Sequence, residues 1–154
     1  PRRGAAVFLP GGYPELHAGQ LAASTRFMDG MREAAIEGHP IYGECGGYMA
    51  LGAGLIDAHG ERHAMCGLLP LVTSFAEPRL HLGYQDAELL VDTALGKLGT
   101  RFRGHEFHYA TVVEEGEEDP LFQCSDSTRE VTSLIGRRVA NVSGSFLHLI
   151  DRYS

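Results

Sequence analysis

Tryptophan is absent from the sequence, cysteine occurs only three times, and no apolar run approaches the length of a membrane span. The cysteines, Cys45, Cys66 and Cys124, lack metal-type spacing, and their odd number argues against a disulfide framework. Basic residues are also scarce, with 13 lysines and arginines against 20 acidic residues and a net charge of −7. These shortages argue against a membrane protein and against a nucleic-acid partner. We therefore expect a cytoplasmic protein that acts on a small molecule or another protein.

The chain is long enough for one domain with one hydrophobic core, since its 154 residues are 44% hydrophobic. Twenty glycines, many of them at the ends of apparent elements, indicate many tight turns rather than a helical bundle. Residues 1–4 contain no initiator methionine and lead directly into residues 5–9, an apolar segment typical of a buried parallel strand. Because such a strand needs neighbours on both sides, we expect the domain to be truncated at its N-terminus.

A strand, a helix and a second strand are predicted over the first part of the chain. The strand at residues 5–9 ends at Pro10, Gly11 and Gly12, and helical spacing of apolar residues follows from Glu15 to about Gly38. A second strand then begins at Ile41. A βαβ unit with a crossover of this length brings the ends of both strands to one sheet edge. The Gly11–Gly12 loop is therefore expected beside Cys45.

Alternating apolar and polar residues dominate after that point and predict a β-rich second half. Short strand-like pieces flank a turn within residues 54–65. Strands are expected at residues 81–91 and 105–113. An acidic solvated loop is expected at residues 114–120, and a hairpin at residues 131–142 with its turn at residues 136–138.

The spacing Gly43-x-Cys45-x-Gly47 is typical of a nucleophile elbow, a sharp turn between a strand and a helix. Small neighbours are needed there because a Cβ would collide with the backbone or obstruct an acyl substrate. Free N–H groups at the start of the helix are suited to binding an oxyanion, and the helix dipole is expected to lower the thiol pKa. Cys45 is thus the candidate nucleophile, the alternative being an inert buried thiol. Glu44 is expected to turn away from the elbow.

A cysteine nucleophile usually needs an imidazole that takes up and returns its proton. Among the eight histidines, His148 and His108 rank almost equally as that base. His148 follows a strand and a Gly-Ser turn, whereas His108 belongs to the cluster His105-Glu106-Phe107-His108. A zinc site at His105 and His108 is a weak alternative because no third ligand has suitable spacing.

Four segments of the chain resemble the class I glutamine amidotransferases, in particular the branch joined to corrinoid-pathway amide synthases. They are residues 9–15 (Leu-Pro-Gly-Gly-Tyr-Pro-Glu), 43–48 (Gly-Glu-Cys-Gly-Gly-Tyr), 103–109 (Arg-Gly-His-Glu-Phe-His-Tyr) and 143–148 (Ser-Gly-Ser-Phe-Leu-His). The set looks most like the C-terminal domain of cobyrinate or hydrogenobyrinate a,c-diamide synthases. The resemblance implies a flavodoxin-like α/β fold with a mixed, mainly parallel central sheet. Residues 1–154 would form the amidotransferase domain, the C-terminal portion of a larger synthetase.

The resemblance also implies which residues perform the chemistry. Cys45 would attack the side-chain amide of glutamine, His148 would act as its base, and N–H groups of Gly12 and Gly46 would form the oxyanion hole. Supporting or glutamine-binding roles are expected for Gly11, His105, Glu106 and His108. No metal or cofactor is expected in this domain. ATP and Mg²⁺ would belong to an N-terminal synthetase domain, which would also bind most of the corrinoid and use the released ammonia.

Two positions depart from the wider class I pattern. Ile150 stands where many members have a glutamate that orients the histidine, so the resemblance implies a Cys-His dyad. Met49 stands where many members, including cobyric acid synthases, have glutamine, and this favours the a,c-diamide synthase branch.

Other functions stay open at this level. A related amidotransferase would serve nickel-sirohydrochlorin or a peptidoglycan precursor, a different cysteine-elbow hydrolase would act on another acyl substrate, and a non-catalytic domain would only dock onto a synthetase. Arg79 and Tyr84 are expected to be a solvated arginine and a packed tyrosine rather than glutamine ligands.

Overall fold

The computed structural model describes residues 5–117, 119–126 and 132–153. Residues 1–4, Glu118 and Val131, included in the expectations above, lie outside this part of the chain. Strand β1 (Val7–Leu9) pairs in parallel with β2 (Ile41–Glu44), as predicted for a βαβ unit. The single helix expected between them is wrong, because that segment forms η1 (Pro14–His17), α1 (Ala18–Ala22) and α2 (Thr25–Ile36).

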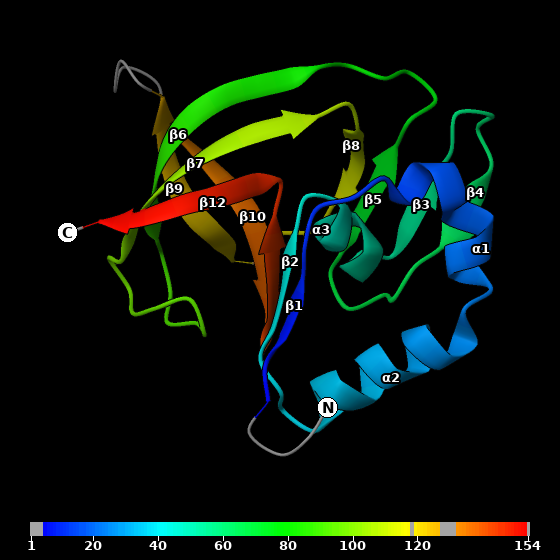
Figure 1. Cartoon of the computed structure of the whole chain (residues 1–154), viewed down its shortest axis with the longest axis horizontal. Helices are drawn as coiled ribbons and strands as arrows, with labels where there is room; N and C mark the ends of the chain where they lie inside the picture. The colour runs from blue at the N-terminus through cyan, green and yellow to red at the C-terminus, as the bar shows by residue number, and fades with distance from the viewer. Residues whose placement is uncertain (1–4, 118, 127–131, 154) are drawn as a thin grey trace.

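The remaining elements alternate between two sheets. They are α3 (Gly46–Leu51), β3 (Gly54–Ile56), β4 (Arg62–Ala64), β5 (Leu71–Ser74), β6 (His81–Leu89), β7 (Arg101–His108), β8 (Thr111–Glu115), β9 (Pro120–Asp126), β10 (Thr132–Val139), β11 (Val142–Ser145) and β12 (Leu147–Tyr153). The larger sheet has the order β1-β2-β11-β10-β9-β6-β7-β12, and the smaller has the order β4-β3-β5-β8. Figure 1 shows the larger sheet curling through one side of the molecule, with the helices and the smaller sheet on the other.

The mixed α/β fold is confirmed, but its parallel part is smaller than expected. Parallel pairing is confined to β1-β2-β11 and β3-β5 among the described strands, and the other pairs are antiparallel. The long antiparallel strands arise from the alternating second half of the chain. Parallel strands need crossover connections, which α2 provides between β1 and β2 and residues 45–141 provide between β2 and β11.

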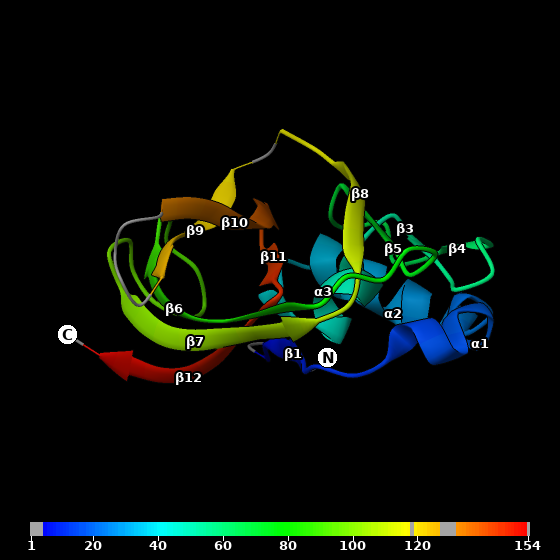
Figure 2. The ribbon, with the colours of Figure 1, turned by 90° about the horizontal axis from the view of Figure 1, so that it is seen from above.

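Three predicted boundaries in the second half need correction. The strand expected at residues 105–113 breaks at Tyr109 and Ala110, so that β7 lies in the large sheet and β8 in the small one (Figure 2). β8 also includes Glu114 and Glu115, which were expected in a solvated loop. The hairpin of β10 and β11 turns at Ala140 and Asn141 rather than at residues 136–138, and Ala140 has a positive φ of 51°.

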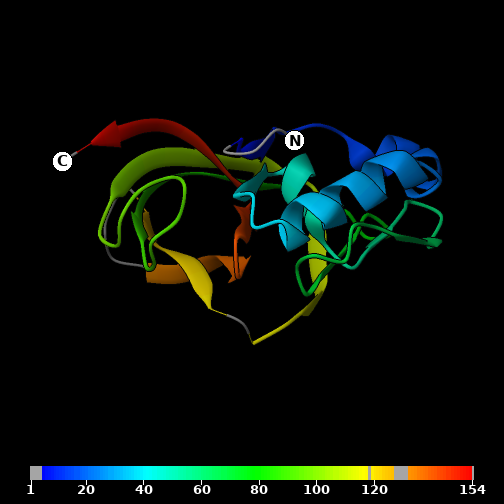
Figure 3. The ribbon, with the colours of Figure 1, turned by 90° about the horizontal axis from the view of Figure 1, so that it is seen from below.

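Strand β2 and helix α3 lie at the junction of two hydrophobic clusters. Ile41 and Tyr42 are adjacent in β2 and so point to opposite faces, each entering a different cluster. Helix α3 packs against β1, β2 and β11 of the large sheet and against β3 and β5 of the small one. Figure 3 shows α2 running beside this junction, where Met28, Met31 and Ala34 join the first cluster. The segment that carries Cys45 is therefore held from both sheets. None of the described helices is long and apolar enough to cross a membrane.

Candidate active site

Cys45 occupies the sharp turn between β2 and α3, and its backbone confirms the predicted elbow. Its φ of 50° and ψ of −105° lie in a region that L-residues rarely adopt. A Cβ on Gly46 would lie 2.7 Å from the backbone nitrogen of Gly12, and one on Gly47 would collide with the carbonyl oxygen of Leu9. The glycines thus let the elbow fit tightly against the loop that follows β1.

The Gly11–Gly12 loop meets both Cys45 and His148, as predicted from the order of the strands. A Cβ on Gly11 would lie 2.7 Å from Cε1 of His148 and 3.7 Å from the Cβ of Cys45. His148 comes from β12 at the opposite edge of the large sheet, more than 100 positions later in the chain. The curl of the large sheet therefore brings the Gly11–Gly12 loop, Cys45 and His148 close together.

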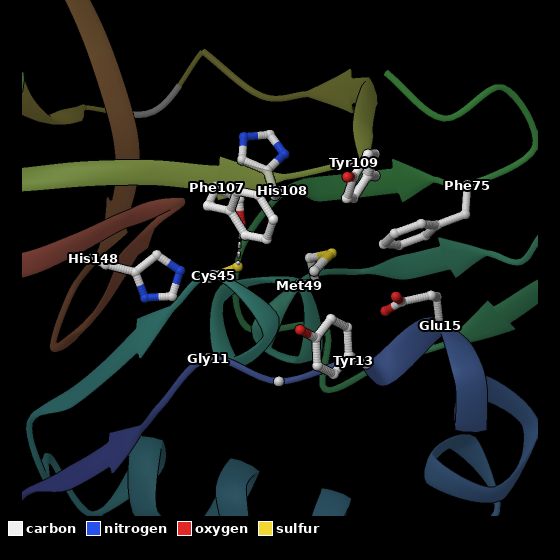
Figure 4. Close-up of a pocket in the computed structure, with 11 residues that line it drawn as sticks. Gly11, Tyr13, Glu15, Cys45, Met49, Phe75, Phe107, His108, Tyr109 and His148 are labelled. Carbon is white, nitrogen blue, oxygen red and sulfur yellow. Dashed lines mark hydrogen bonds between the residues drawn. The ribbon is translucent and has the colours of Figure 1, made fainter. Parts of the chain in front are cut away.

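A cavity of about 390 Å³ opens at this point, and its walls are mostly apolar and aromatic. Figure 4 shows Cys45 between the Gly11 loop and the side chains of Phe107 and His108, with His148 to the left. The cavity is lined by Gly11, Gly12, Tyr13, Glu15, Cys45, Met49, Phe75, Phe107, His108, Tyr109 and His148. Its volume suits a small metabolite, and Cys45 in its wall is only 6% exposed.

Burial raises the pKa of the Cys45 thiol to about 11. A hydrogen bond from the Gly46 N–H acts in the opposite direction, and the negative charges of Glu15 and Glu44 raise the pKa further. The start of α3 lowers the thiol pKa as expected, through the Gly46 N–H, but burial outweighs this contribution. The protonated thiol donates a long hydrogen bond of 3.9 Å to the carbonyl oxygen of Phe107. Cys45 thus needs a neighbouring base in order to react.

His148 has a carboxylate partner that the sequence did not suggest. Its Nδ1 lies 3.1 Å from Oε1 of Glu44, and Oε2 of the same carboxylate accepts the N–H of Leu149 at 3.2 Å. Glu44 was expected to turn away from the elbow, and this expectation is wrong. No local signal pointed to this contact, because His148 lies 104 positions further along the chain than Glu44.

His108 lines the cavity but is held as a neutral residue. Its Nδ1 lies 3.1 Å from the carbonyl oxygen of Ala110, and its ring stacks on Phe146 at 3.9 Å and on His81 at 4.6 Å. Burial lowers the pKa of His108 to about 4, with a smaller contribution from the nearby His81. The geometry therefore favours His148 over His108 as the base that serves Cys45.

Of the other members of the cluster, Phe107 lines the cavity, whereas His105 and Glu106 lie outside its lining. The ring of His105 stacks on that of His148 with 5.0 Å between centroids. Burial raises the pKa of Glu106, which pairs in register with Leu147. His105 and His108 contact different groups, and the one set of described residues with convergent metal-type ligands, Asp57, Glu61 and His63, does not include them.

Several residues of the cavity were missed by sequence reasoning. Glu15 is the most informative, because its Oε2 is buried and has no hydrogen-bond partner within the described residues. Burial raises the pKa of this carboxyl group. Its position three residues after Gly12 was the available signal. Tyr84, by contrast, lies outside the cavity lining and is 74% exposed, so the expected packing of this ring is wrong.

Comparison with known proteins assigns this arrangement to a class. Residues 2–152 match the family model of the CobB/CobQ-like glutamine amidotransferase domain, and the chain belongs to this family. A crystal structure of a glutamine amidotransferase aligns with a TM-score of 0.58 and 22% identity, over 93% of this chain and 69% of the other. The PurLQS structure from Thermotoga maritima aligns with a TM-score of 0.60 and 17% identity, over 93% and 68% of the two chains. These two likenesses confirm the predicted fold.

A curated relative is more similar in sequence. The hydrogenobyrinate a,c-diamide synthase of a Sinorhizobium species is 58% identical over 146 residues, which cover 95% of this chain and 33% of that protein. The chain therefore spans about a third of the length of the curated relatives that it matches.

Proposed function

We propose that residues 1–154 form the glutamine amidotransferase domain, and the C-terminal portion, of a larger a,c-diamide synthase. The domain releases ammonia from glutamine for ATP-dependent amidation of the a and c carboxylates of cobyrinate or hydrogenobyrinate in cobalamin biosynthesis. One observation carries the glutaminase part of the proposal: Cys45, in a strained elbow, meets the Gly11 loop and His148 at one cavity. The name and length of the curated relatives support the corrinoid acceptor and the larger synthetase.

The first half-reaction forms a thioester. The sulfur of Cys45 attacks the side-chain carbonyl carbon of glutamine while His148 accepts the thiol proton. N–H groups of Gly12 and Gly46 stabilise the negative oxygen, consistent with the Gly46 N–H that already faces Sγ. The carbon–nitrogen bond then breaks, and His148 returns the proton to the departing nitrogen, which leaves as ammonia.

The second half-reaction restores the enzyme. A water molecule attacks the thioester carbonyl carbon, with His148 accepting a proton from the water. The carbon–sulfur bond breaks, glutamate is released and the Cys45 thiol is re-formed. The sum is glutamine plus water to glutamate plus ammonia.

Glu15 supplies recognition of the α-amino group of glutamine in this proposal. Its buried oxygen lacks a partner and its carboxyl group lines the same cavity as Cys45. A bound ammonium group would supply the missing hydrogen bond and charge partner. Gly11, His105, Glu106 and His108 act as supporting residues, with His108 closing the cavity as a neutral wall.

The acceptor reaction takes place outside this domain. ATP and Mg²⁺ bind to the N-terminal synthetase domain, which also holds most of the corrinoid, and residues 1–154 need no cofactor of their own. The three unpaired cysteines support a reducing compartment, the cytoplasm, as the location.

Labelling with a diazo-ketone analogue of glutamine, followed by intact-mass measurement, tests the proposal. The parent chain should gain one adduct, Cys45→Ser none, and His148→Ala should react at least tenfold more slowly. Cys124→Ser is the matched control, because Cys124 is a buried thiol of the second cluster and lies outside the cavity lining. This variant should label like the parent.

Other outcomes would replace the proposal with a different function. A folded chain that reacts at Cys45 with iodoacetamide but neither binds nor hydrolyses glutamine would be a different cysteine hydrolase. A folded chain with no adduct from either reagent would favour a docking domain. Glutaminase activity that is stimulated by a nickel-sirohydrochlorin or peptidoglycan amide ligase, and not by a corrinoid synthetase, would change the acceptor.

A further inference from the structure

We propose that Glu44 is a positioning residue for His148, so that the site works as a Cys45–His148–Glu44 triad rather than a dyad. The inference rests on the proposed glutaminase function, in which His148 is the base. It assigns a role to the residue that directly precedes the nucleophile.

The carboxylate of Glu44 is held by two contacts from β12. Oε1 lies 3.1 Å from Nδ1 of His148, and Oε2 accepts the N–H of Leu149 at 3.2 Å. The side chains of His148 and Glu44 are both largely shielded from solvent, with exposures of 24% and 13%. The carboxylate of Glu44 therefore contacts both the His148 ring and the backbone of β12, the strand that carries this ring.

The contact determines which imidazole nitrogen bears the proton. An ionised carboxylate only accepts hydrogen bonds, so Nδ1 of a neutral His148 must be the donor. The lone pair is then left on Nε2, where it can accept a proton from Cys45. After that transfer the negative carboxylate stabilises the imidazolium that has formed.

The ring is also fixed on its other sides. His105 stacks on it at 5.0 Å with an angle of 19° between the planes. The Cα of Gly11 approaches so closely that a Cβ there would lie 2.7 Å from Cε1 of His148. Contact with Glu44 completes this slot and selects one orientation of the ring.

A direct electrostatic effect of Glu44 on Cys45 would hinder ionisation of the thiol, whereas an effect through His148 would promote it. The charge of Glu44 raises the pKa of the Cys45 thiol, although less than burial does. If this were the main influence of Glu44, its removal would ease ionisation and accelerate alkylation of Cys45. If Glu44 acts through His148, its removal slows both alkylation and turnover.

Glu44→Gln keeps the shape of the side chain and tests this difference in sign. The amide oxygen can still accept the Leu149 N–H, but the amide NH₂ then faces Nδ1 and forces the proton to Nε2. We expect kcat for glutamine hydrolysis to fall about 10²- to 10⁴-fold, with KM changed less than about threefold. Alkylation of Cys45 by iodoacetamide should slow at least tenfold. Glu88→Gln is the matched control, because this glutamate has an exposed side chain and pairs only loosely, at 3.8 Å, with Arg101.

Nitrogen-15 NMR of the imidazole gives a readout that does not depend on activity. His148 signals, assigned by their loss in His148→Gln, should show protonated Nδ1 in the parent and a shift of the proton towards Nε2 in Glu44→Gln. Glu44→Asp, measured in the same way, replaces the glutamine variant if that variant fails to fold.

An unchanged tautomer, unchanged kcat or faster alkylation in Glu44→Gln would overturn the inference. A parent chain without glutaminase activity would instead overturn the proposed function. In that case the NMR comparison still decides whether Glu44 orients His148.

Discussion

The elbow glycines near Cys45 have no room for a side chain, whereas the glycine in α2 does, and alanine substitutions should show this difference. A Cβ at position 47 would collide with the Leu9 carbonyl, whereas a Cβ at Gly30 has open space around it. We expect Gly47→Ala to lower the free energy of unfolding by about 1–3 kcal/mol and to abolish Cys45 labelling. Gly30→Ala should raise it by about 0.5–1 kcal/mol. Urea denaturation measures both, and equal effects of the two changes would contradict a close-packed elbow.

His108 should make the protein less stable in mild acid. Its pKa is about 4 in the folded protein against an ordinary value of 6.5, so the unfolded chain binds the extra proton first. The stabilising contribution is complete above about pH 6.5 and is lost as the pH falls towards 4, with a size on the order of 2 kcal/mol.

Denaturant titrations at pH 7 and pH 4.5 measure this effect. The loss of stability between these pH values should be smaller in His108→Gln than in the parent. The ring of His81 stacks on that of His108, so His81→Gln is the control that separates the contributions of the two rings. An identical loss in the parent and in His108→Gln would contradict the assignment.

Single residues of the site were predictable to different degrees. Gly43, Cys45 and Gly47 predict an elbow, because the need for small residues around the nucleophile is confined to five consecutive positions. The partner of Glu44 was not predictable from local pattern, since β12 reaches it from about 100 positions further along the chain. The raised pKa of Cys45 was missed for a related reason: the helix terminus is a local feature, whereas burial depends on the complete cavity.

Element boundaries failed at two breaks in the chain that the apolar pattern does not show. The predicted long helix breaks at Ala23 and Ser24, whose backbone N–H groups still bond to Gly19 and Leu21 of α1 before α2 begins. The predicted strand at residues 105–113 breaks where Ala110 becomes fully buried and its carbonyl oxygen meets the His108 ring. In both cases the apolar pattern continues through the break, so periodicity alone does not show it.

Asn141 joins two elements, and its removal should separate them. Its side-chain nitrogen donates to the carbonyl oxygens of Ala35 at 3.1 Å and His39 at 2.6 Å, tying the end of α2 to the β10–β11 turn. We expect Asn141→Ala to lower the free energy of unfolding by about 1–3 kcal/mol, because both carbonyl groups lose the hydrogen bond from this side chain. Asn141→Asp, with no donor at all, should cost at least as much.

Thermal melts followed by circular dichroism measure the change. Ser24→Ala, which removes an exposed side-chain hydrogen bond of the same helical region, is the control and should cost less than about 0.5 kcal/mol. Equal losses in Ser24→Ala and Asn141→Ala would show that Asn141 does not couple the elements.

The whole molecule is needed to form the cavity, because its lining comes from the β1–η1 loop, the elbow, the end of β5, the β7–β8 connection and β12. The first two were placed correctly from sequence through the βαβ rule. The others depend on how the large sheet curls and on the transfer of the chain to the small sheet at Tyr109 and Ala110. These are properties of long-range pairing, which alternation of residues does not specify.

Because the binding site requires the complete fold, glutamine should stabilise the molecule as a whole. At a glutamine concentration 100 times its Kd the gain is about 2.7 kcal/mol, which corresponds to a rise of about 5–10 °C in Tm for a chain of this size. Cys45→Ser is the appropriate background, because it prevents turnover. Glutaramic acid, which has the same amide and carboxylate but no amino group, should raise Tm much less, since it leaves the buried oxygen of Glu15 without a partner.

Glu15→Gln in the same background should remove the preference for glutamine over glutaramic acid by lowering the glutamine response to that of the analogue. Glu33→Gln, an equal change of charge on the exposed side of α2, should leave both responses unaltered. If Glu15→Gln retained the full preference, the amino group would be bound elsewhere, and the unpaired carboxylate would have no part in choosing the substrate. The stabilisation by glutamine would then report only on the amide end of the cavity, where Cys45 and His148 lie.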